Sequence, residues 1–427
     1  MNILILGSGG REHAIAWKIK QSPKCGKIYL APGNGGTEEI ATNLSINPKN
    51  FDEVADAIKQ NQIELLVVGP EDPLVHGIVD FLRKDEQLQD LRIVGPTAEG
   101  AQLEGSKEYA KEFMKRYKIP TADAVTVTKE NLEETLKKME RMEPPYVLKA
   151  DGLAGGKGVI ITEELAEARS ELRKLIEDRK FGEASEKVLL EQFLKGIEVS
   201  FFVLTDGEDF RILPEAKDYK RIGEKDTGLN TGGMGAVSPV IFADRAFKEK
   251  VSKTIIKPTI DGLKKEGIDY CGFIFFGLIS VRGNPYVIEY NVRMGDPETE
   301  VVLPRIKSDF LELLIATAER KLIDVDIEYE RYTASTVVYV SRGYPEFYEK
   351  GHEITIGDAR AVLPFHAGTT HKDGKLVTNG GRVMALTGLG KNLAEALSKS
   401  YAGGEEVSWE GKKFRQDIGF DLKALGQ

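Results

Sequence analysis

A glycine-rich segment with lysines on either side is the clearest candidate for binding phosphate. It reads DGLAGGKG over residues 151–158, with Lys157 inside it and Lys149 two residues before it. Backbone N–H groups of such a segment can close over phosphate oxygens, and lysines add point charges. It is not a Walker A motif, because Asp151 stands where the first glycine is required and Gly158 replaces the Ser or Thr. Since both flanking segments are strand-like, we predict a phosphate-binding flap.

Glu289 and Asn291 end a predicted strand, PYVIEYN, in which alternate residues point to the same face. A carboxylate and an amide oxygen side by side suit a hard cation such as Mg²⁺, which keeps water and phosphate oxygens as its other ligands. Arg293, which can bind an anion, and a tight turn at residues 294–296 follow directly. This grouping predicts a metal–phosphate site.

Three glycine-rich loops follow apolar, strand-like runs in the first hundred residues. They span residues 7–13 (GSGGREH), 31–37 (APGNGGT) and 69–73 (GPEDP). Ligands of open α/β sheets bind where the strands end, so these loops favour a substrate site at that edge. The first loop departs from the dinucleotide fingerprint G-x-G-x-x-G at Glu12, which argues against a Rossmann dehydrogenase.

A fourth candidate is the charged, glycine-rich stretch between Pro214 and Pro239, which we predict to be one long loop. It brings together a carboxylate, two cations and adaptable backbone, as DYKR at 218–221 and NTGGMGA at 230–236. Loops of this length in compact domains are usually functional.

The five histidines show no metal-ligand spacing. His366 and His371 are predicted to be solvated loop residues, and no histidine receives a catalytic role.

The elements that must position these groups change in character along the chain. Residues 1–102 are predicted to form an N-terminal parallel-sheet α/β domain, with strands at 2–6, 27–30, 64–68 and 92–94. Ser106 is a predicted cap for a helix that reaches Tyr117. Residues 103–324 mix strands and helices, and alternation of period two predicts a small β-rich domain at 325–427. The fold class is therefore multidomain, α/β and α+β.

Composition excludes several classes of protein. The 427 residues carry a net charge of −9 without a block of five like charges, so we expect no nucleic-acid partner. Cys25 and Cys271 are too few for a disulfide framework or a thiolate zinc site, which favours a reducing compartment. No run of about 18 apolar residues is present. We expect a cytoplasmic protein without a membrane partner.

Together these motifs resemble those of the phosphoribosylamine–glycine ligase (glycinamide ribonucleotide synthetase) family, within the ATP-grasp superfamily. The resemblance covers essentially the whole chain and rests on blocks in this order: GSGGREHA, APGNGGT, GPEDPLV, QLEGSK, KADGLAGGKGV, KDTGLNTGGMGA, EYNVRMGDPETE and FHAGT…TNGGRV. It implies an ATP-grasp region at 103–324, with a mobile flap subdomain at about 120–194. It also implies that ATP phosphorylates the glycine carboxylate and that the amine of 5-phosphoribosylamine then displaces phosphate. Mg²⁺ or Mn²⁺ is the implied cofactor, and a monomer is expected.

The resemblance also assigns residues. Contacts to ATP are implied for Lys107, Lys149, Gly152, Gly155, Gly156, Lys157, Gly158, Glu191, Gln192, Phe193, Leu194 and Glu198. Contacts to glycine or phosphoribosylamine are implied for Gly9, Gly10, Arg11, Gly33, Asn34, Gly35, Thr37, Arg221, Thr231, Gly232, Gly233, Gly295 and Asp296. Glu289 and Asn291 would hold the metal, and the catalytic residues would be Arg293, Lys220 and Asp218.

Three positions depart from the family pattern. The flap has Gly155 where Ala is usual, Tyr219 stands where His is common, and Glu300 replaces a usual Gln. The last two bear on details of substrate contact. Two alternatives remain: another ATP-grasp carboxylate–amine ligase with different substrates, because the flap and metal pair are generic, and a nucleotide-binding module without turnover.

Overall fold

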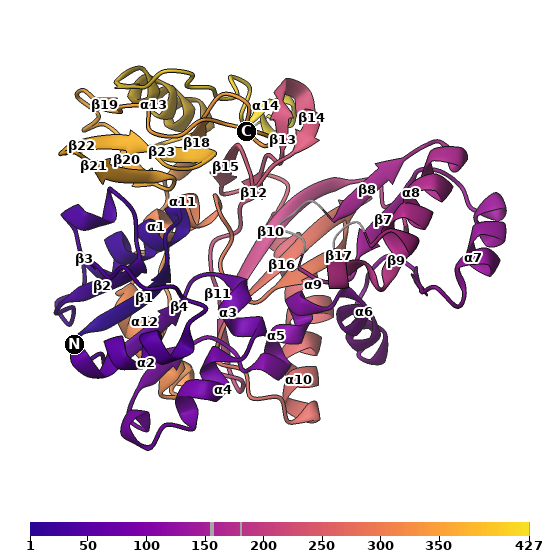
Figure 1. Ribbon diagram of the computed structural model, residues 1–427, viewed down its shortest axis with the longest axis horizontal. Coiled ribbons are helices and arrows are strands. Elements are labelled where there is room, and N and C mark those ends of the chain that lie inside the picture. Colours follow the sequence, from indigo (N-terminus) through magenta and orange to yellow (C-terminus); the bar gives the residue numbers. More distant parts are fainter. Residues whose placement is uncertain (154–157, 180–181, 427) are drawn as a thin grey trace.

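The computed structural model describes residues 1–153, 158–179 and 182–426. An N-terminal sheet lies beside a C-terminal sheet, and a smaller subdomain projects from the opposite side of the molecule (Figure 1). No helix within the described residues is long and apolar enough to cross a membrane.

The N-terminal part is a five-stranded parallel sheet in the order β3-β2-β1-β4-β5, which confirms the predicted fold class. Its strands are β1 (Ile3–Gly7), β2 (Ile28–Pro32), β3 (Thr42–Asn43), β4 (Leu65–Val68) and β5 (Arg92–Val94). Its helices are α1 (Gly10–Ile19), α2 (Phe51–Gln60), α3 (Glu71–Val75) and α4 (Ile78–Arg83). Strand β1 is buried on both faces: Leu4 and Leu6 share a core with α2 and α4, whereas Ile3 and Ile5 pack with α1. The strand order reverses between β1 and β4, because β2 and β3 lie on one side of β1 whereas β4 and β5 lie on the other. Ligand-binding loops are expected at such a reversal.

Two helices, α5 (Ala98–Gly105) and α6 (Lys107–Arg116), lead into a small subdomain. Ser106 caps α6 as predicted, because its hydroxyl accepts from the backbone N–H of Tyr109. The subdomain is an antiparallel sheet, in the order β6-β9-β7-β8, with its own hydrophobic core. Its elements are β6 (Ala124–Val127), α7 (Leu132–Lys138), β7 (Tyr146–Ala150), β8 (Val159–Thr162), α8 (Leu165–Glu177) and β9 (Val188–Gln192).

A second antiparallel sheet, in the order β11-β10-β16-β17, follows within the region where the resemblance predicts an ATP-grasp fold. Its strands are β10 (Ile197–Thr205), β11 (Phe210–Ile212), β16 (Gly272–Val281) and β17 (Asn284–Asn291). The associated helices are α9 (Arg245–Val251), α10 (Lys257–Glu266), α11 (Thr299–Val302) and α12 (Phe310–Ala318), and a π-helical turn at Ser252–Ile256 joins α9 to α10. Apolar residues of α12 pack in the core on the second face of the N-terminal sheet, so the two parts share one core.

The third sheet combines strands from two distant parts of the chain, in the order β12-β15-β18-β23-β20. Two strands, β12 (Lys217–Asp218) and β15 (Gly235–Ser238), come from the segment predicted to be one long loop, so that prediction is wrong. Its glycines hid short strands, including a hairpin of β13 (Arg221–Gly223) and β14 (Thr227–Asn230). The other three strands are β18 (Thr333–Val340), β20 (Leu363–His366) and β23 (Arg382–Gly390). The sheet therefore crosses the predicted boundary at residue 324.

The rest of the C-terminal part packs around this sheet. It contains β19 (Thr355–Ile356), β21 (Thr369–Lys372), β22 (Lys375–Thr378), α13 (Leu393–Glu405), β24 (Val407–Ser408) and α14 (Phe420–Ala424). His366 is only 4% exposed, so the prediction of a solvated loop residue is wrong. Its backbone N–H donates to Nδ1 of His13 on α1 at 3.0 Å, which joins the C-terminal sheet to the N-terminal part.

Candidate active site

One cavity of about 780 Å³ opens between the N-terminal part, the small subdomain and the C-terminal sheet. The predicted site residues that line it are Arg11, Lys107, Lys149, Gly152, Gly158, Glu191, Gln192, Phe193, Leu194, Glu198, Asp218, Lys220, Arg221, Thr231, Gly232, Glu289, Asn291, Arg293 and Asp296. The predicted residues that are described but do not line it are Gly9, Gly10, Gly33, Asn34, Gly35, Thr37, Gly233 and Gly295. Gly155, Gly156 and Lys157 lie outside the described residues.

Two lysines converge on one buried carboxylate at the base of the small subdomain. Lys149 on β7 lies 2.9 Å from Glu191 on β9, and Lys111 on α6 lies 3.4 Å from it. Lys149 also donates to the backbone oxygen of Ile288 at 3.3 Å, which connects the subdomain to β17. Burial lowers the pKa of Lys111 to about 8. A single carboxylate thus offsets two ammonium groups and leaves positive charge for an anion.

The start of the predicted flap is fixed to the N-terminus of α6. The Ser106 hydroxyl donates to the Asp151 carboxylate at 3.1 Å, and the backbone N–H of Glu108 donates to it at 2.7 Å. Lys107 donates to the backbone oxygen of Gly152 at 3.2 Å. Because the N-terminus of a helix favours negative charge, Asp151 holds the strand end in place while Lys107 faces the cavity.

The strand β17 delivers Glu289 and Asn291 to the cavity wall, as the alternation predicted. Asn291 is 8% exposed, and its Nδ2 is buried without a hydrogen-bond partner among the described residues. Its Oδ1 accepts from Arg293 Nη2 at 3.1 Å. A buried amide left unpaired is costly, so this position suits a bound group.

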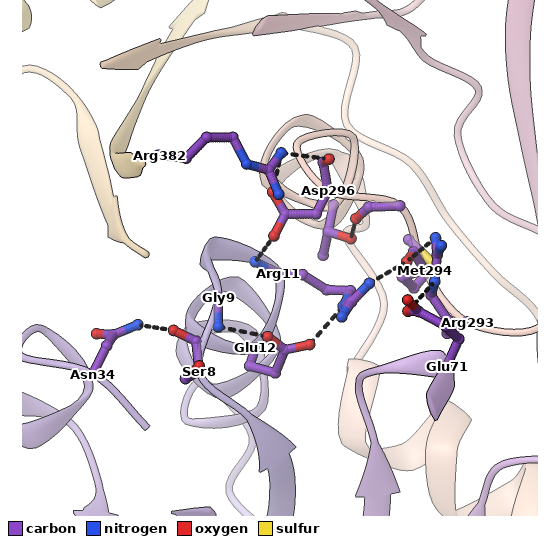
Figure 2. Close-up of polar contacts among 12 residues, drawn as sticks. Ser8, Gly9, Arg11, Glu12, Asn34, Glu71, Arg293, Met294, Asp296 and Arg382 are labelled. Carbon is purple, nitrogen blue, oxygen red and sulfur yellow. Dashed lines mark hydrogen bonds and ion pairs between the residues drawn. The ribbon is translucent and has the colours of Figure 1, made fainter. Parts of the chain in front are cut away.

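Arg293 is held by two carboxylates: Glu71, which belongs to the predicted substrate loop at residues 69–73, and Glu104, which sequence reasoning did not assign to the site. Arg293 Nη2 lies 2.7 Å from Glu104 at the end of α5. Its Nε lies 3.2 Å from Glu71 at the start of α3, a contact that Figure 2 shows. Burial raises the pKa of Glu104 to about 7. Burial alone would also raise the pKa of Glu71, but Arg293 and Arg11 lower it to about 2. The arginine is therefore rigidly oriented at the cavity wall.

A second charged group surrounds Lys220, in the segment between β12 and β13. Lys220 Nζ lies 2.9 Å from Glu198 on β10. Asp218 on β12 is 9% exposed, and burial raises its pKa. The carboxylate of Asp218 is thus a poorly solvated anion on the cavity wall, which favours a cationic ligand.

The loop after β1 uses its own carboxylate where a dinucleotide fingerprint has glycine. Glu12 accepts from the backbone N–H of Gly9 at 2.7 Å and from Arg11 Nε at 2.5 Å (Figure 2). Gly69 is needed opposite, because a Cβ there would collide with the Glu12 carboxylate. The guanidinium of Arg11 also donates to the backbone oxygen of Met294 at 3.2 Å. The loop therefore fixes Arg11 at the cavity and leaves the Gly9 amide occupied.

Asp296 connects this loop to the C-terminal sheet. Its Oδ1 lies 3.0 Å from Arg382 on β23, and its Oδ2 accepts from the backbone N–H of Arg11 at 3.4 Å (Figure 2). Arg382 also donates to the backbone oxygen of Gly232 at 2.6 Å. Sequence reasoning missed Arg382, whose only signal was its position in the TNGGRV block.

The loop at residues 33–37 supports the site from behind. Asn34 is 5% exposed, and its Nδ2 donates to the backbone oxygens of Ser8 and His366 at 2.9 and 2.8 Å. Its Oδ1 accepts from the backbone N–H groups of Gly36 and Thr37. With every polar atom of its side chain engaged, Asn34 joins the first loop to the C-terminal sheet.

Tyr219 and Glu300, the two residues after the flap that depart from the family pattern, do not line the cavity. The hydroxyl of Tyr219 donates to Asp421 on α14 at 2.7 Å. Glu300 on α11 is fully buried against Gly10, and both its carboxylate oxygens are unpartnered among the described residues. Burial raises its pKa well above the ordinary value, and Asp296 raises it further. Burial therefore favours the neutral form of the Glu300 carboxyl group.

Comparison with known proteins gives matches along nearly the whole chain. Residues 1–104, 105–299 and 334–421 match the N domain, the ATP-grasp (A) domain and the C domain of phosphoribosylglycinamide synthetase. Phosphoribosylamine–glycine ligase of Haemophilus influenzae is 43% identical over 98% of this chain and 98% of its own length. The bifunctional purine biosynthetic protein PUR2,5 of Pichia angusta is 42% identical over 98% of this chain, which spans 53% of that longer protein.

Solved structures give the same result. The crystal structure of phosphoribosylamine–glycine ligase from Thermotoga maritima has a TM-score of 0.84 and 39% identity, and covers 98% of this chain and all of that one. The biotin carboxylase domain of 2-oxoglutarate carboxylase from Hydrogenobacter thermophilus has a TM-score of 0.73 over 100% of this chain and 94% of its own. At 18% identity, that second likeness shows a shared fold only.

Proposed function

This chain belongs to the phosphoribosylglycinamide synthetase family, and we propose that its central cavity joins glycine to 5-phosphoribosylamine. It is an ATP-dependent carbon–nitrogen ligase of purine biosynthesis, and its products are glycinamide ribonucleotide, ADP and phosphate. One observation carries the proposal: a single cavity holds a lysine-rich phosphate region, a carboxylate–amide pair and a cluster of arginines and carboxylates. A reaction between a nucleotide, an amino acid and a sugar phosphate requires these three sets of groups.

The first step activates the carboxylate of glycine. A carboxylate is a poor acyl donor, and transfer of the γ-phosphoryl group of ATP replaces its oxide leaving group with phosphate. Charge then develops on the transferred group, and positively charged side chains already in place stabilise it. Lys149, Lys107 and Arg293 line the cavity and are held by hydrogen bonds or ion pairs, so little reorganisation is needed.

Glu289 and Asn291 fit a divalent cation bound together with ATP phosphates. Their oxygens are hard donors of the kind that Mg²⁺ prefers. The unpartnered Nδ2 of Asn291 is a hydrogen-bond donor, so it suits a phosphate oxygen bound beside the cation. Among the described residues, no group of three or more His, Cys, Asp or Glu side chains could hold a metal, so ATP and water would complete the coordination. Mg²⁺ or Mn²⁺ bound here would neutralise phosphate charge and act as a Lewis acid.

We assign the nucleoside of ATP to the wall formed by β9 and the residues that follow it. Residues 191–194 line the cavity and can offer backbone groups to adenine, as the resemblance implies. Glu198 also lines the cavity, where its carboxylate can accept from the ribose hydroxyls, and it already accepts from Lys220. The side chain of Glu191 adds a function that the resemblance did not include, because it fixes Lys149.

Glycine and phosphoribosylamine are assigned to the part of the cavity lined by Asp218 and Arg11. The buried carboxylate of Asp218 suits the ammonium group of glycine, and Lys220 lies beside it. Arg11, with Arg221 and the backbone at Thr231 and Gly232, suits the sugar phosphate. Arg293 also lines the cavity and can stabilise the acyl phosphate.

The test is ADP formation by purified protein with ATP, Mg²⁺, glycine and phosphoribosylamine generated in situ, each omitted in turn. ADP formation that requires all four, with glycinamide ribonucleotide in equal amount, is expected. If another amino acid or amine replaces a substrate without loss of rate, the protein is a different ATP-grasp ligase. ATP binding without turnover would indicate a nucleotide-binding module.

We propose a monomer in the cytoplasm, and the free thiols of Cys25 and Cys271 agree with a reducing compartment.

A further inference from the structure

Glu298 is a carboxylate on the cavity wall that none of the roles above uses. It is 3% exposed and lies between the turn at Asp296 and the first residue of α11. The hydroxyl of Ser200 on β10 donates to its Oε1 at 3.2 Å. Gly295 leaves room for the other oxygen, since a Cβ there would collide with Glu298 Oε2. The fold thus holds this carboxylate in one place.

The charged groups that face Glu298 come from both substrate regions. Asp218 and Lys220 face it from the segment around β12, and Arg293 faces it from the end of β17. Burial raises the pKa of Glu298 to about 7, Asp218 raises it further, and Lys220 and Arg293 oppose the rise. A group with this pKa exchanges protons readily near neutral pH.

The second half of the reaction needs a group that accepts a proton. The amine nitrogen of phosphoribosylamine attacks the carbonyl carbon of glycyl phosphate, the new C–N bond forms, and the C–O bond to phosphate breaks. The attacking nitrogen becomes positively charged and must lose one proton before a neutral amide results. On the basis of the proposed function, we propose that Glu298 is the general base that takes this proton and passes it to the departing phosphate.

Neighbouring carboxylates are less suited to this task because each is paired with a cation or lies elsewhere in the site. Asp296 is 3.0 Å from Arg382, Glu198 is 2.9 Å from Lys220, and Glu104 is 2.7 Å from Arg293. Such pairing stabilises the ionised forms of Asp296 and Glu198 and weakens each of them as a base. Burial keeps the pKa of Glu104 at about 7, but both of its carboxylate oxygens are engaged, Oε1 by Arg293 and Oε2 by the backbone N–H of Val292. The carboxylate of Glu298 instead accepts from the neutral hydroxyl of Ser200 and from its own backbone N–H. Asp218 is also buried, but its place near glycine suits binding of the ammonium group.

The test separates activation of glycine from attack by the amine. Glu298→Gln keeps the size of the side chain and can still accept from Ser200. We expect the kcat for ligation to phosphoribosylamine to fall by about 10²- to 10⁴-fold. Hydroxylamine is a strong nucleophile that attacks acyl phosphates without a base, so glycine hydroxamate formation from ATP and glycine should stay within about twofold of wild type. The acid limb of the wild-type kcat/KM profile, near pH 7, should be absent from the residual ligation activity.

Two further variants keep the result interpretable. Gly295→Ala retains the carboxylate but displaces it, and should reduce ligation more than hydroxamate formation. Glu208→Gln, an exposed change in the turn before β11, should leave both activities unchanged. Normal ligation by Glu298→Gln, an equal loss of both activities, or a raised KM for glycine with unchanged kcat would overturn the proposal. Failure of the proposed function itself would look different, because wild-type protein would then form neither product.

Discussion

Acidification should loosen the contact between the N-terminal part and the C-terminal sheet through two buried histidines. Burial lowers the pKa of His13 to about 3 and that of His366 to about 4. In the unfolded chain both titrate near 6.5, so below that pH the unfolded state binds more protons and stability falls. Full stability is present above about pH 6.5 and is lost progressively down to the folded pKa values.

The size of this loss follows from the difference in pKa. At pH 5 both histidines stay neutral in the folded protein. In the unfolded chain each histidine is protonated, because pH 5 lies about 1.5 units below its pKa of about 6.5. At 1.36 kcal/mol per unit, this is about 2 kcal/mol for each histidine and about 4 kcal/mol for the pair. The contribution of His13 can be isolated with His13→Asn, because Asn Oδ1 can still accept from the backbone N–H of His366.

Urea unfolding at pH 7, 6 and 5 measures this effect. Trp17 is a suitable fluorescent probe, because its ring lies 5.7 Å from that of Phe365 at the same contact. His13→Asn should lose about 2 kcal/mol less than wild type between pH 7 and pH 5. His76→Asn, a change of an exposed histidine, should alter the loss by less than about 0.5 kcal/mol. If wild type and His13→Asn lose equal stability over this range, the argument from burial is refuted.

Three further predictions concern the cavity and the core beside it. Glu289→Ala should leave a folded protein whose rate of ADP formation falls by more than the ~10- to 100-fold loss typical when a residue that supports a metal ligand is replaced. Near-normal turnover at ordinary Mg²⁺ would exclude Glu289 as a metal ligand. Lys149→Ala should weaken ATP binding by about 10- to 100-fold, since a charged hydrogen bond contributes about 1.5–3 kcal/mol; unchanged affinity by calorimetry would remove it from the phosphate region. Glu300→Gln should be more stable than wild type at pH 8, because a carboxyl with a raised folded pKa loses stability as pH rises above about 4.5; equal urea midpoints at pH 8 would contradict this.

Local patterns predicted those parts of the site that lie close together in sequence. Four apolar runs identified strands of the N-terminal sheet, and Ser106 identified the start of α6. Alternation in β17 placed Glu289 and Asn291 on one cavity wall. In each case a period or a cap acts over a few residues, so the sequence carries the information directly.

The partners that orient these groups could not be predicted in this way. Glu71 and Glu104 lie 222 and 189 residues from Arg293, yet they hold it. The short strands β12 and β15 were hidden in a glycine-rich stretch, because β15 pairs with β18, which comes much later in the chain, and β12 pairs with β15. His366 carried no sign of burial, since a histidine in a short strand becomes buried only when α1 packs against it. These features depend on tertiary packing, which local propensity does not record.

The mixed origin of the third sheet has a consequence for modularity. Strand β15 pairs with β18 along its whole length, from Gly235 opposite Val337 to Ser238 opposite Ala334, and it also carries β12 with Asp218. A truncated chain that ends before residue 333 would leave β15 as a bare edge, which favours aggregation, and would remove the support of Asp218. Exchange of the C-terminal part between relatives should therefore succeed only when the strand-pairing register is preserved, so that part is inherited together with the chemistry it supports.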